Sequence, residues 1–127
     1  MKKDYQNILI IKMSSLGDII HALPSLYVLR KTYPKARITW AVHPAFADIL
    51  PGKPWIDEIY LVDRKRIREL SYLREVHRDL KARHFDLVID LQMIAKSAII
   101  SFLSGCSHRI GYQDGREGSF LASRPIS

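Results

Sequence analysis

The chain has 127 residues and a formal net charge of +7, with 47% hydrophobic and 26% charged residues. This length suits one domain with a single core, and the composition is that of a globular protein and not of a disordered one. No apolar run is long enough to cross a bilayer, and the one cysteine, Cys106, excludes an internal disulfide and fits a reducing compartment. We therefore expect a cytoplasmic protein.

The first half of the chain predicts strands alternating with helices. Asn7–Ile11 is a continuous apolar run, typical of a strand buried on both faces, and Arg37–Val42 predicts a second strand. A helical pattern opens at Asp18 and ends before Pro34; Pro24 inside it lacks an N–H group, so we expect the helix to kink or restart there. The face of this helix is predicted from Ile19, Ile20, Leu23, Leu26, Tyr27 and Arg30.

The second half continues the alternation. His43 and Pro44 open a short helical stretch to Leu50, and residues 58–62 predict a third strand. An amphipathic helix follows, with its apolar face at Ile67, Leu70, Leu73, Val76 and Leu80. Residues 86–91 predict a fourth strand, Ala95–Leu103 a helix and 109–112 a fifth strand, whereas 113–127 show no assignable pattern.

Such alternation is typical of a parallel sheet with right-handed crossovers. We predict an α/β fold, a Rossmann-like doubly wound sheet with strand order 3-2-1-4-5, in which the first and fourth strands are neighbours at the topological switch point. The loops after these strands, residues 13–17 and 92–94, should then flank one crevice although they are far apart in the sequence.

The first of these loops carries a candidate site. Ser14, Ser15 and Gly17 form a tight polar turn that a ligand can approach closely, and Asp18 follows it. An acid at a helix start also caps free N–H groups, a contribution of about 0.5–2 kcal/mol. The sequence therefore leaves open whether the Asp18 carboxylate is only a helix cap or also a functional group.

Lys96 is the matching candidate on the second loop. It falls in the first turn of a predicted helix, where a cation opposes the helix dipole. An anion nearby would offset this cost, either Asp18 across the crevice or a bound phosphate or carboxylate. The alternative is a solvated lysine turned away from the crevice.

Most of the excess positive charge lies between residues 64 and 84, and such a stripe attracts nucleic acid, anionic lipid or a phosphorylated sugar. The stripe is either a solvated helix face or a docking surface for an anionic partner. Its single aromatic residue, Tyr72, offers few stacking platforms for nucleic acid. There is no G-x-G-x-x-G, no complete P-loop and no metal-ligand spacing among the five histidines, so we expect neither a dinucleotide site, nor nucleotide hydrolysis, nor a metal.

Residues 11–24, Ile-Lys-Met-Ser-Ser-Leu-Gly-Asp-Ile-Ile-His-Ala-Leu-Pro, resemble the opening of the bacterial lipopolysaccharide heptosyltransferases of glycosyltransferase family 9. The resemblance continues through Val-Ile-Asp-Leu-Gln at 88–92, Lys-Ser-Ala at 96–98, Gly-Tyr at 111–112 and Gly-Arg-Glu at 115–117. The Ser-Ser-x-Gly-Asp and Asp-x-Gln forms are more similar to the first heptosyltransferase, which acts on Kdo, than to the second. Met93 departs from the glycine that is common in that subgroup.

The resemblance implies a GT-B architecture, in which two Rossmann-like domains face each other across a cleft. Residues 1–127 would be the N-terminal domain, which receives the acceptor Kdo-lipid A. The C-terminal domain, which binds the donor ADP-heptose, would be absent, so the chain alone is expected to be inactive as a transferase. No cofactor or metal is implied.

The same resemblance implies roles for individual residues. Asp18 matches the base that removes a proton from the acceptor hydroxyl during inverting transfer. The acceptor-binding positions are Ser14, Ser15, Gly17, Arg64, Lys65, Arg66, Lys96 and Arg116. The rest of the basic helix would suit the anionic inner face of the cytoplasmic membrane, with no nucleic acid as partner. Two alternatives remain: a non-enzymatic module that binds a polyanion through the basic helix, and a nucleotide-sugar enzyme with another acceptor.

Overall fold

The computed structural model describes residues 5–92 and 95–111. Within them, five parallel strands form one sheet in the order β3-β2-β1-β4-β5, so the predicted order is confirmed and β1 lies between β2 and β4. The strands are β1 (Asn7–Ile11), β2 (Arg37–Val42), β3 (Glu58–Leu61), β4 (Leu87–Asp90) and β5 (Arg109–Gly111). β3 is one residue and β4 two residues shorter than the sequence predicts, and the predicted end of the fifth strand, Tyr112, lies outside the described residues.

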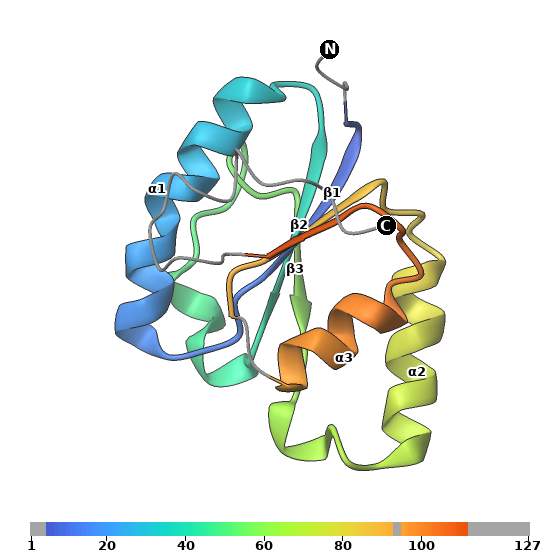
Figure 1. The fold of residues 1–127 in the computed structure, drawn as a ribbon. Coiled ribbons are helices and arrows are strands. Elements are labelled where there is room, and N and C mark those ends of the chain that lie inside the picture. Colours follow the sequence, from blue (N-terminus) through green and yellow to red (C-terminus); the bar gives the residue numbers. More distant parts are fainter. Residues whose placement is uncertain (1–4, 93–94, 112–127) are drawn as a thin grey trace.

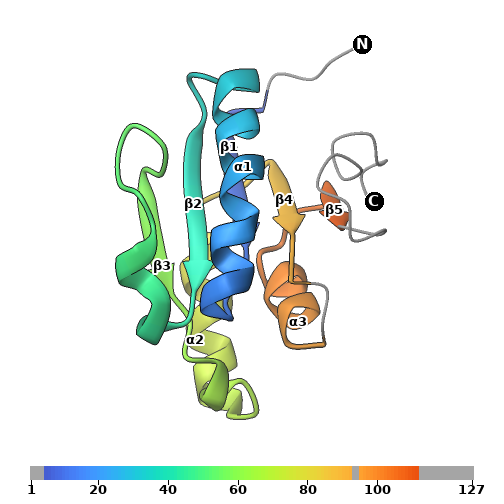
Figure 2. The ribbon, with the colours of Figure 1, turned by 90° about the vertical axis from the view of Figure 1, so that its left-hand side faces the viewer.

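Helices cover both faces of the sheet, as a doubly wound fold requires. Figure 1 shows helix α1 (Leu16–Thr32) on one side of the strands and helices α2 (Leu70–Lys81) and α3 (Ala95–Leu103) on the other. In the rotated view, α1 crosses in front of the strands (Figure 2). Two short 3-10 turns, η1 (Pro44–Ile49) and η2 (Arg64–Arg66), complete the connections.

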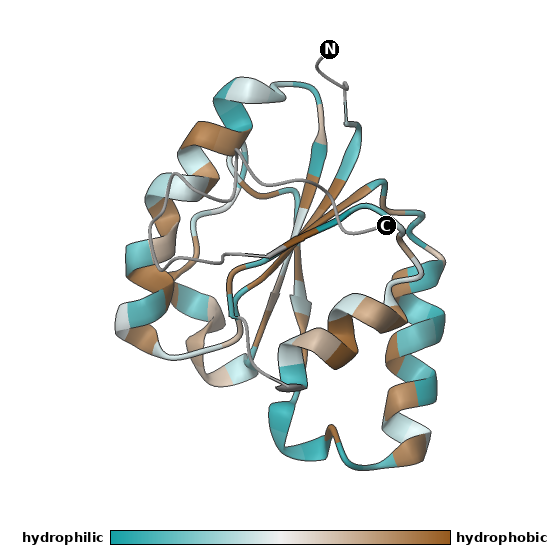
Figure 3. Cartoon of the chain, in the orientation of Figure 1, coloured by the Kyte–Doolittle hydropathy of each residue, from teal (hydrophilic) through white to brown (hydrophobic). Residues whose placement is uncertain are grey.

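The central strand explains why the first apolar run is continuous. Ile8 and Ile10 pack in the core layer that contains the inner residues of α1, whereas Leu9 and Ile11 pack in the layer that contains those of α2. Because both faces of β1 are buried, an alternating polar pattern would place polar groups in one of the two layers. Figure 3 shows hydrophobic residues, in brown, along the strands where they lie between the helices.

Helix α1 differs from its predicted form in two respects. It begins at Leu16, with Ser15 as the N-cap, and it runs through Pro24 without a break, so the expected restart there is wrong. The predicted face is also partly wrong: Leu26 is buried, but Ile20 and Tyr27 are exposed. Successive helical residues are about 100° apart, so each apolar pair turns only one member toward the sheet.

Helix α2 keeps its predicted amphipathic character but starts later. Ile67 is buried in the turn before the helix, and Leu70, at its first position, is 63% exposed. Tyr72 is buried in place of Leu70, and its hydroxyl oxygen accepts the Asp63 N–H at 2.7 Å. The hydroxyl gives this aromatic ring a satisfied polar end inside the core, which the helical periodicity did not reveal.

Candidate functional site

The loops that follow β1 and β4 meet at the carboxyl edge of the sheet, as the sequence predicts. Gln92, two residues beyond β4, reaches across to the end of β1. Its side-chain Oε1 accepts the N–H of Met13 at 2.8 Å and the N–H of Ser14 at 3.2 Å. The two loops are therefore directly joined, by residues 79 and 78 apart in the sequence.

Asp18 is the third residue of α1 and is exposed at this edge. Its Oδ2 accepts the hydroxyl of Ser15 at 3.1 Å and the N–H of Ser15 at 3.4 Å. Ser15 is therefore the N-cap residue, and Asp18 closes a capping box behind it. The Ser15 N–H, the Ser15 hydroxyl and the charge of Lys12 together lower the pKa of Asp18, so the carboxylate is ionised at neutral pH.

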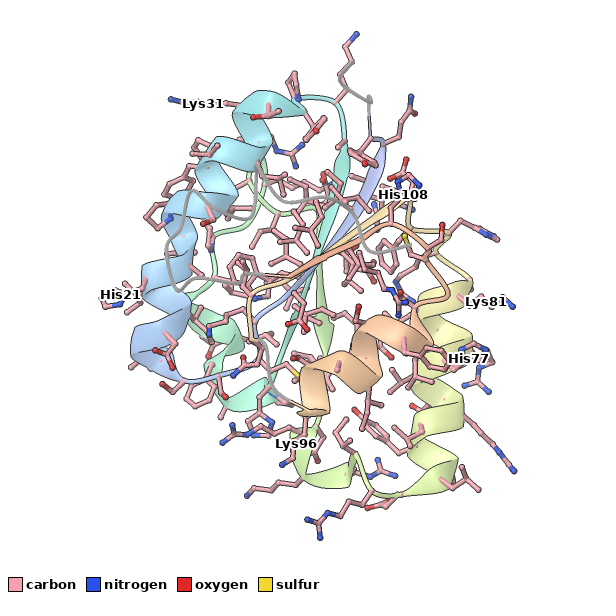
Figure 4. All side chains as sticks on the ribbon, viewed as in Figure 1. His21, Lys31, His77, Lys81, Lys96 and His108 are labelled. Atoms are coloured by element: carbon pink, nitrogen blue, oxygen red, sulfur yellow. The ribbon has the colours of Figure 1, made fainter. Side chains whose placement is uncertain are left out.

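After the Ser15 hydrogen bonds, the charges of Lys12 and, to a smaller extent, His21 lower the pKa of Asp18. Lys96, for which the sequence left Asp18 open as one of several partners, does not pair with it. Lys12 follows β1 directly, is half-buried, and donates from Nζ to the Leu91 carbonyl at 3.3 Å. No ion pair joins Lys96 to Asp18 or to any other described residue. Lys96 lies half-buried in the first turn of α3, where its charge opposes the helix dipole (Figure 4).

Of the three predicted basic residues in η2, only Arg64 is shown to contact the β1 loop. Its Nη1 donates to the hydroxyl oxygen of Ser14 at 2.5 Å, and Ser14 is only 4% exposed. Arg66 instead forms an ion pair with Glu69 at 3.1 Å and lies over the ring of Tyr72, 4.5 Å from its centroid. Lys65 is exposed.

A buried carboxylate supports the loop that follows β4. Asp90 ends β4 and accepts the Gln92 N–H through Oδ1 and the Ser97 hydroxyl through Oδ2, both at 3.0 Å. Asp90, Gln92 and Lys12 were not among the predicted site residues. The available signal was position: each is a polar residue at or just beyond the end of an apolar strand at the switch point.

Among the described residues, the structure gives no contact that explains two of the predicted acceptor-binding positions, Gly17 and Arg116. Gly17 lies in the first turn of α1, and a Cβ added there would meet nothing within 4 Å, so no close backbone approach explains the glycine. Arg116 falls outside the described residues. Figure 4 also shows His21 on the outer side of α1, away from the sheet.

A cavity in the described part of the chain lies away from the loops around Asp18. This cavity of about 320 Å³, lined in part by Arg30, Lys35 and Lys53, lies at the amino ends of β2 and β3, the opposite edge from Asp18. Among residues 5–92 and 95–111, no three His, Cys, Asp or Glu side chains gather as metal ligands. In the same part of the chain, no helix has the length and apolar character needed to cross a membrane.

A doubly wound parallel sheet with charged residues at its switch point defines a Rossmann-like domain. Comparison with known proteins shows which proteins with such a domain the chain is similar to. The family model described as glycosyltransferase family 9 (heptosyltransferase) matches residues 73–127. Lipopolysaccharide heptosyltransferase 1 of Escherichia coli K12 is 31% identical over 119 residues, which is 87% of this chain and 37% of that protein.

Solved structures agree with this relationship. A family 9 glycosyltransferase from Veillonella parvula superposes with a TM-score of 0.78 at 30% identity, over 88% of this chain and 34% of that chain. The E. coli heptosyltransferase WaaC, solved with ADP-2-deoxy-2-fluoro heptose, gives a TM-score of 0.73 at 26% identity, over 96% of this chain and 42% of that chain.

The chain is thus similar over most of its length to the bacterial lipopolysaccharide heptosyltransferases of glycosyltransferase family 9, and the resemblance predicted from its sequence is confirmed. It spans little more than a third of the length of the curated relative from E. coli, at 37%.

Proposed function

We propose that this chain is the acceptor-binding part of an inverting glycosyltransferase that moves heptose from ADP-heptose to the Kdo of lipid A. The observation that carries the proposal is the exposed Asp18 carboxylate at the carboxyl edge of the sheet, with the charge of Lys12 acting on it and Arg64 bound to the neighbouring Ser14. The lipopolysaccharide heptosyltransferases among its relatives support the same chemistry.

In this proposal, Asp18 is the catalytic base. Its carboxylate accepts the proton of the acceptor hydroxyl while that oxygen attacks the anomeric carbon of the donor sugar. The bond from the anomeric carbon to the phosphate oxygen breaks on the opposite face, ADP leaves with the electron pair, and the anomeric configuration inverts. An exposed carboxylate is needed here, because a buried one would not reach a substrate hydroxyl.

The cations would bind the acidic acceptor. Lys12, Arg64 and Lys96 form no ion pair with any described residue, so their charge is available for the carboxylate of Kdo and the phosphates of lipid A. The other acceptor-binding positions remain part of the proposal: Ser14, Ser15, Gly17, Lys65, Arg66 and Arg116.

A lipid acceptor also gives the basic helix a role. Arg74, Arg78 and Lys81 are exposed on α2, and each basic residue near an anionic bilayer contributes about 1 kcal/mol. We propose a cytoplasmic protein that is peripheral to the inner face of the membrane. ADP-heptose would be bound mainly by a separate donor domain, without a metal, so that the chain alone is inactive.

The alternative function is a non-enzymatic module that binds polyanions through α2. It shares the basic surface but assigns no role to the crevice. The relationship to heptosyltransferases favours the enzyme, and the two functions make opposite predictions for a substitution in the crevice.

Acceptor binding by the chain separates them. We expect a soluble Kdo-containing phosphorylated headgroup of lipid A, followed by calorimetry, to bind about tenfold more weakly to Arg64→Met, because a charge-assisted contact is lost. The matched control Arg74→Met, on the exposed face of α2, should bind within twofold of the unmodified chain. Tighter binding to a short DNA duplex, with a steep loss in salt and a larger effect of Arg74→Met, would favour the polyanion module.

A further inference from the structure

We propose that Gln92 is a positioning residue: its side-chain carbonyl fixes the loop between β1 and α1 and so presents the Asp18 carboxylate at the crevice. The inference rests on the proposed function, because it assigns Asp18 the role of base. It adds a residue that makes no contact with Asp18 itself in the structure.

The contact with the loop is specific. Gln92 Oε1 accepts two consecutive N–H groups, those of Met13 and Ser14, at 2.8 and 3.2 Å. Met13 is 1% exposed and Ser14 is 4% exposed, so water has little access to these residues. An amide oxygen has two lone pairs and can satisfy both donors, whereas an apolar side chain of equal length can satisfy neither.

Gln92 is itself held in place. Its N–H donates to Asp90 Oδ1 at 3.0 Å, and the other oxygen of Asp90 accepts the buried Ser97 hydroxyl from α3. Asp90 is 8% exposed and ends the strand that pairs with β1. Gln92 is therefore anchored by a well-packed part of the sheet. A residue that orients a neighbouring loop needs such a rigid support.

Because the loop is held in place, it also fixes the position of the Asp18 carboxylate through Ser15. Ser15 follows Ser14 directly, and both its N–H and its hydroxyl donate to the Asp18 carboxylate. The carbonyls of the loop are held from β2 and its following turn: Lys12 accepts from the Trp40 Nε1 at 3.0 Å and Met13 from the His43 N–H at 3.1 Å. Gln92 supplies the hydrogen bonds to the two N–H groups.

Hydrogen exchange on the chain tests the contact. In Gln92→Met, the amides of Met13 and Ser14 should exchange at least about tenfold faster, because a lost hydrogen bond of roughly 1.4 kcal/mol corresponds to that factor. Gln92→Glu keeps an acceptor oxygen and should retain protection. The matched control Gln6→Met, before the amino end of β1, should leave these amides unchanged. Unchanged protection in Gln92→Met would overturn the inference.

Kinetics test the consequence, in a transferase that carries this sequence together with a donor-binding half. A base that is misplaced by about 1 Å can cost up to about 100-fold in rate, so kcat should fall between about 10- and 100-fold in Gln92→Met. The KM for ADP-heptose should stay within twofold, and Gln92→Glu should recover most of kcat. Unchanged kcat, or a KM that rises as much as kcat falls, would contradict a positioning role. Wild-type turnover in Asp18→Asn would instead refute the proposed function, whatever Gln92 does.

Discussion

At Asp18, one carboxylate accepts two hydrogen bonds from Ser15 and still has a side open to solvent. The two meanings left open by the sequence, helix capping and catalysis, are therefore compatible. The hydrogen bonds lower the pKa of Asp18, which keeps the base in its ionised form across the neutral range.

Replacing Ser15 by Ala should raise the pKa of Asp18 toward about 3.9, the value of a free aspartate, because the side-chain hydrogen bond is lost while the backbone one remains. NMR titration of the Asp18 carboxyl carbon measures the change. Ser71→Ala, on the exposed part of α2, is the matched control. A pKa that does not move in Ser15→Ala would show that the hydroxyl contributes nothing to the ionisation of Asp18.

At the scale of secondary-structure elements, an ion pair joins the segment just after α2 to β3. Arg83, two residues beyond α2, donates to Glu58 from Nη2 at 2.6 Å and from Nε at 2.9 Å, and its guanidinium lies over the ring of Tyr60. Each side chain is about a quarter exposed, at 27% and 25%. Arg83 therefore belongs to the packing of the fold, although in the sequence it is one more member of the basic stripe.

Arg83→Met should lower the free energy of unfolding by about 1–3 kcal/mol, because Glu58 loses its principal hydrogen-bond donor in a partly buried site. Urea denaturation measures this loss, and the exposed Arg74→Met should stay within about 0.5 kcal/mol of the unmodified chain. Equal stability in the two variants would mean that the ion pair contributes no more than a solvated arginine.

The same pair predicts a pH dependence. Hydrogen bonding to Arg83 lowers the pKa of Glu58 in the folded state. Its contribution is therefore complete above the unfolded pKa of about 4.3 and is lost as the pH falls through the lower, folded value. Between pH 5 and pH 3 the unmodified chain should lose more stability than Arg83→Met does. Parallel curves for the two proteins would contradict the assignment.

At the scale of the whole molecule, the sequence is informative about architecture and less so about contacts. Apolar periodicity predicts the five strands, and the order usual in doubly wound sheets predicts which of them are neighbours, because each depends on a local pattern or on one general rule. Tyr72 is buried where Leu70 was expected, and its hydroxyl accepts the Asp63 N–H, a tertiary contact with no periodic signature.

In the candidate site, too, the positions of the loops can be predicted from the sequence, whereas the side-chain contacts cannot. The meeting of the loops after β1 and β4 follows from topology, and so does the position of Asp18. The roles of Lys12, Gln92 and Arg64 depend on side chains that reach between loops separated by dozens of residues. Helix electrostatics left several partners open for Lys96, Asp18 among them, but the residue next to β1 in sequence, Lys12, supplies charge near Asp18.

The central claim, that Asp18 is the base of a heptose transfer, is tested most directly by single-turnover transfer from ADP-heptose to Kdo-lipid A. The enzyme would be a transferase that carries this sequence together with a donor-binding half. Asp18→Asn retains an oxygen that can accept from Ser15 but is a very weak base, so the rate should fall by about 10²–10⁴-fold while ADP-heptose affinity stays within twofold. Asp48→Asn, an exposed acid on η1, should match the unmodified rate. Transfer by Asp18→Asn at that same rate would show that Asp18 is only part of a helix cap.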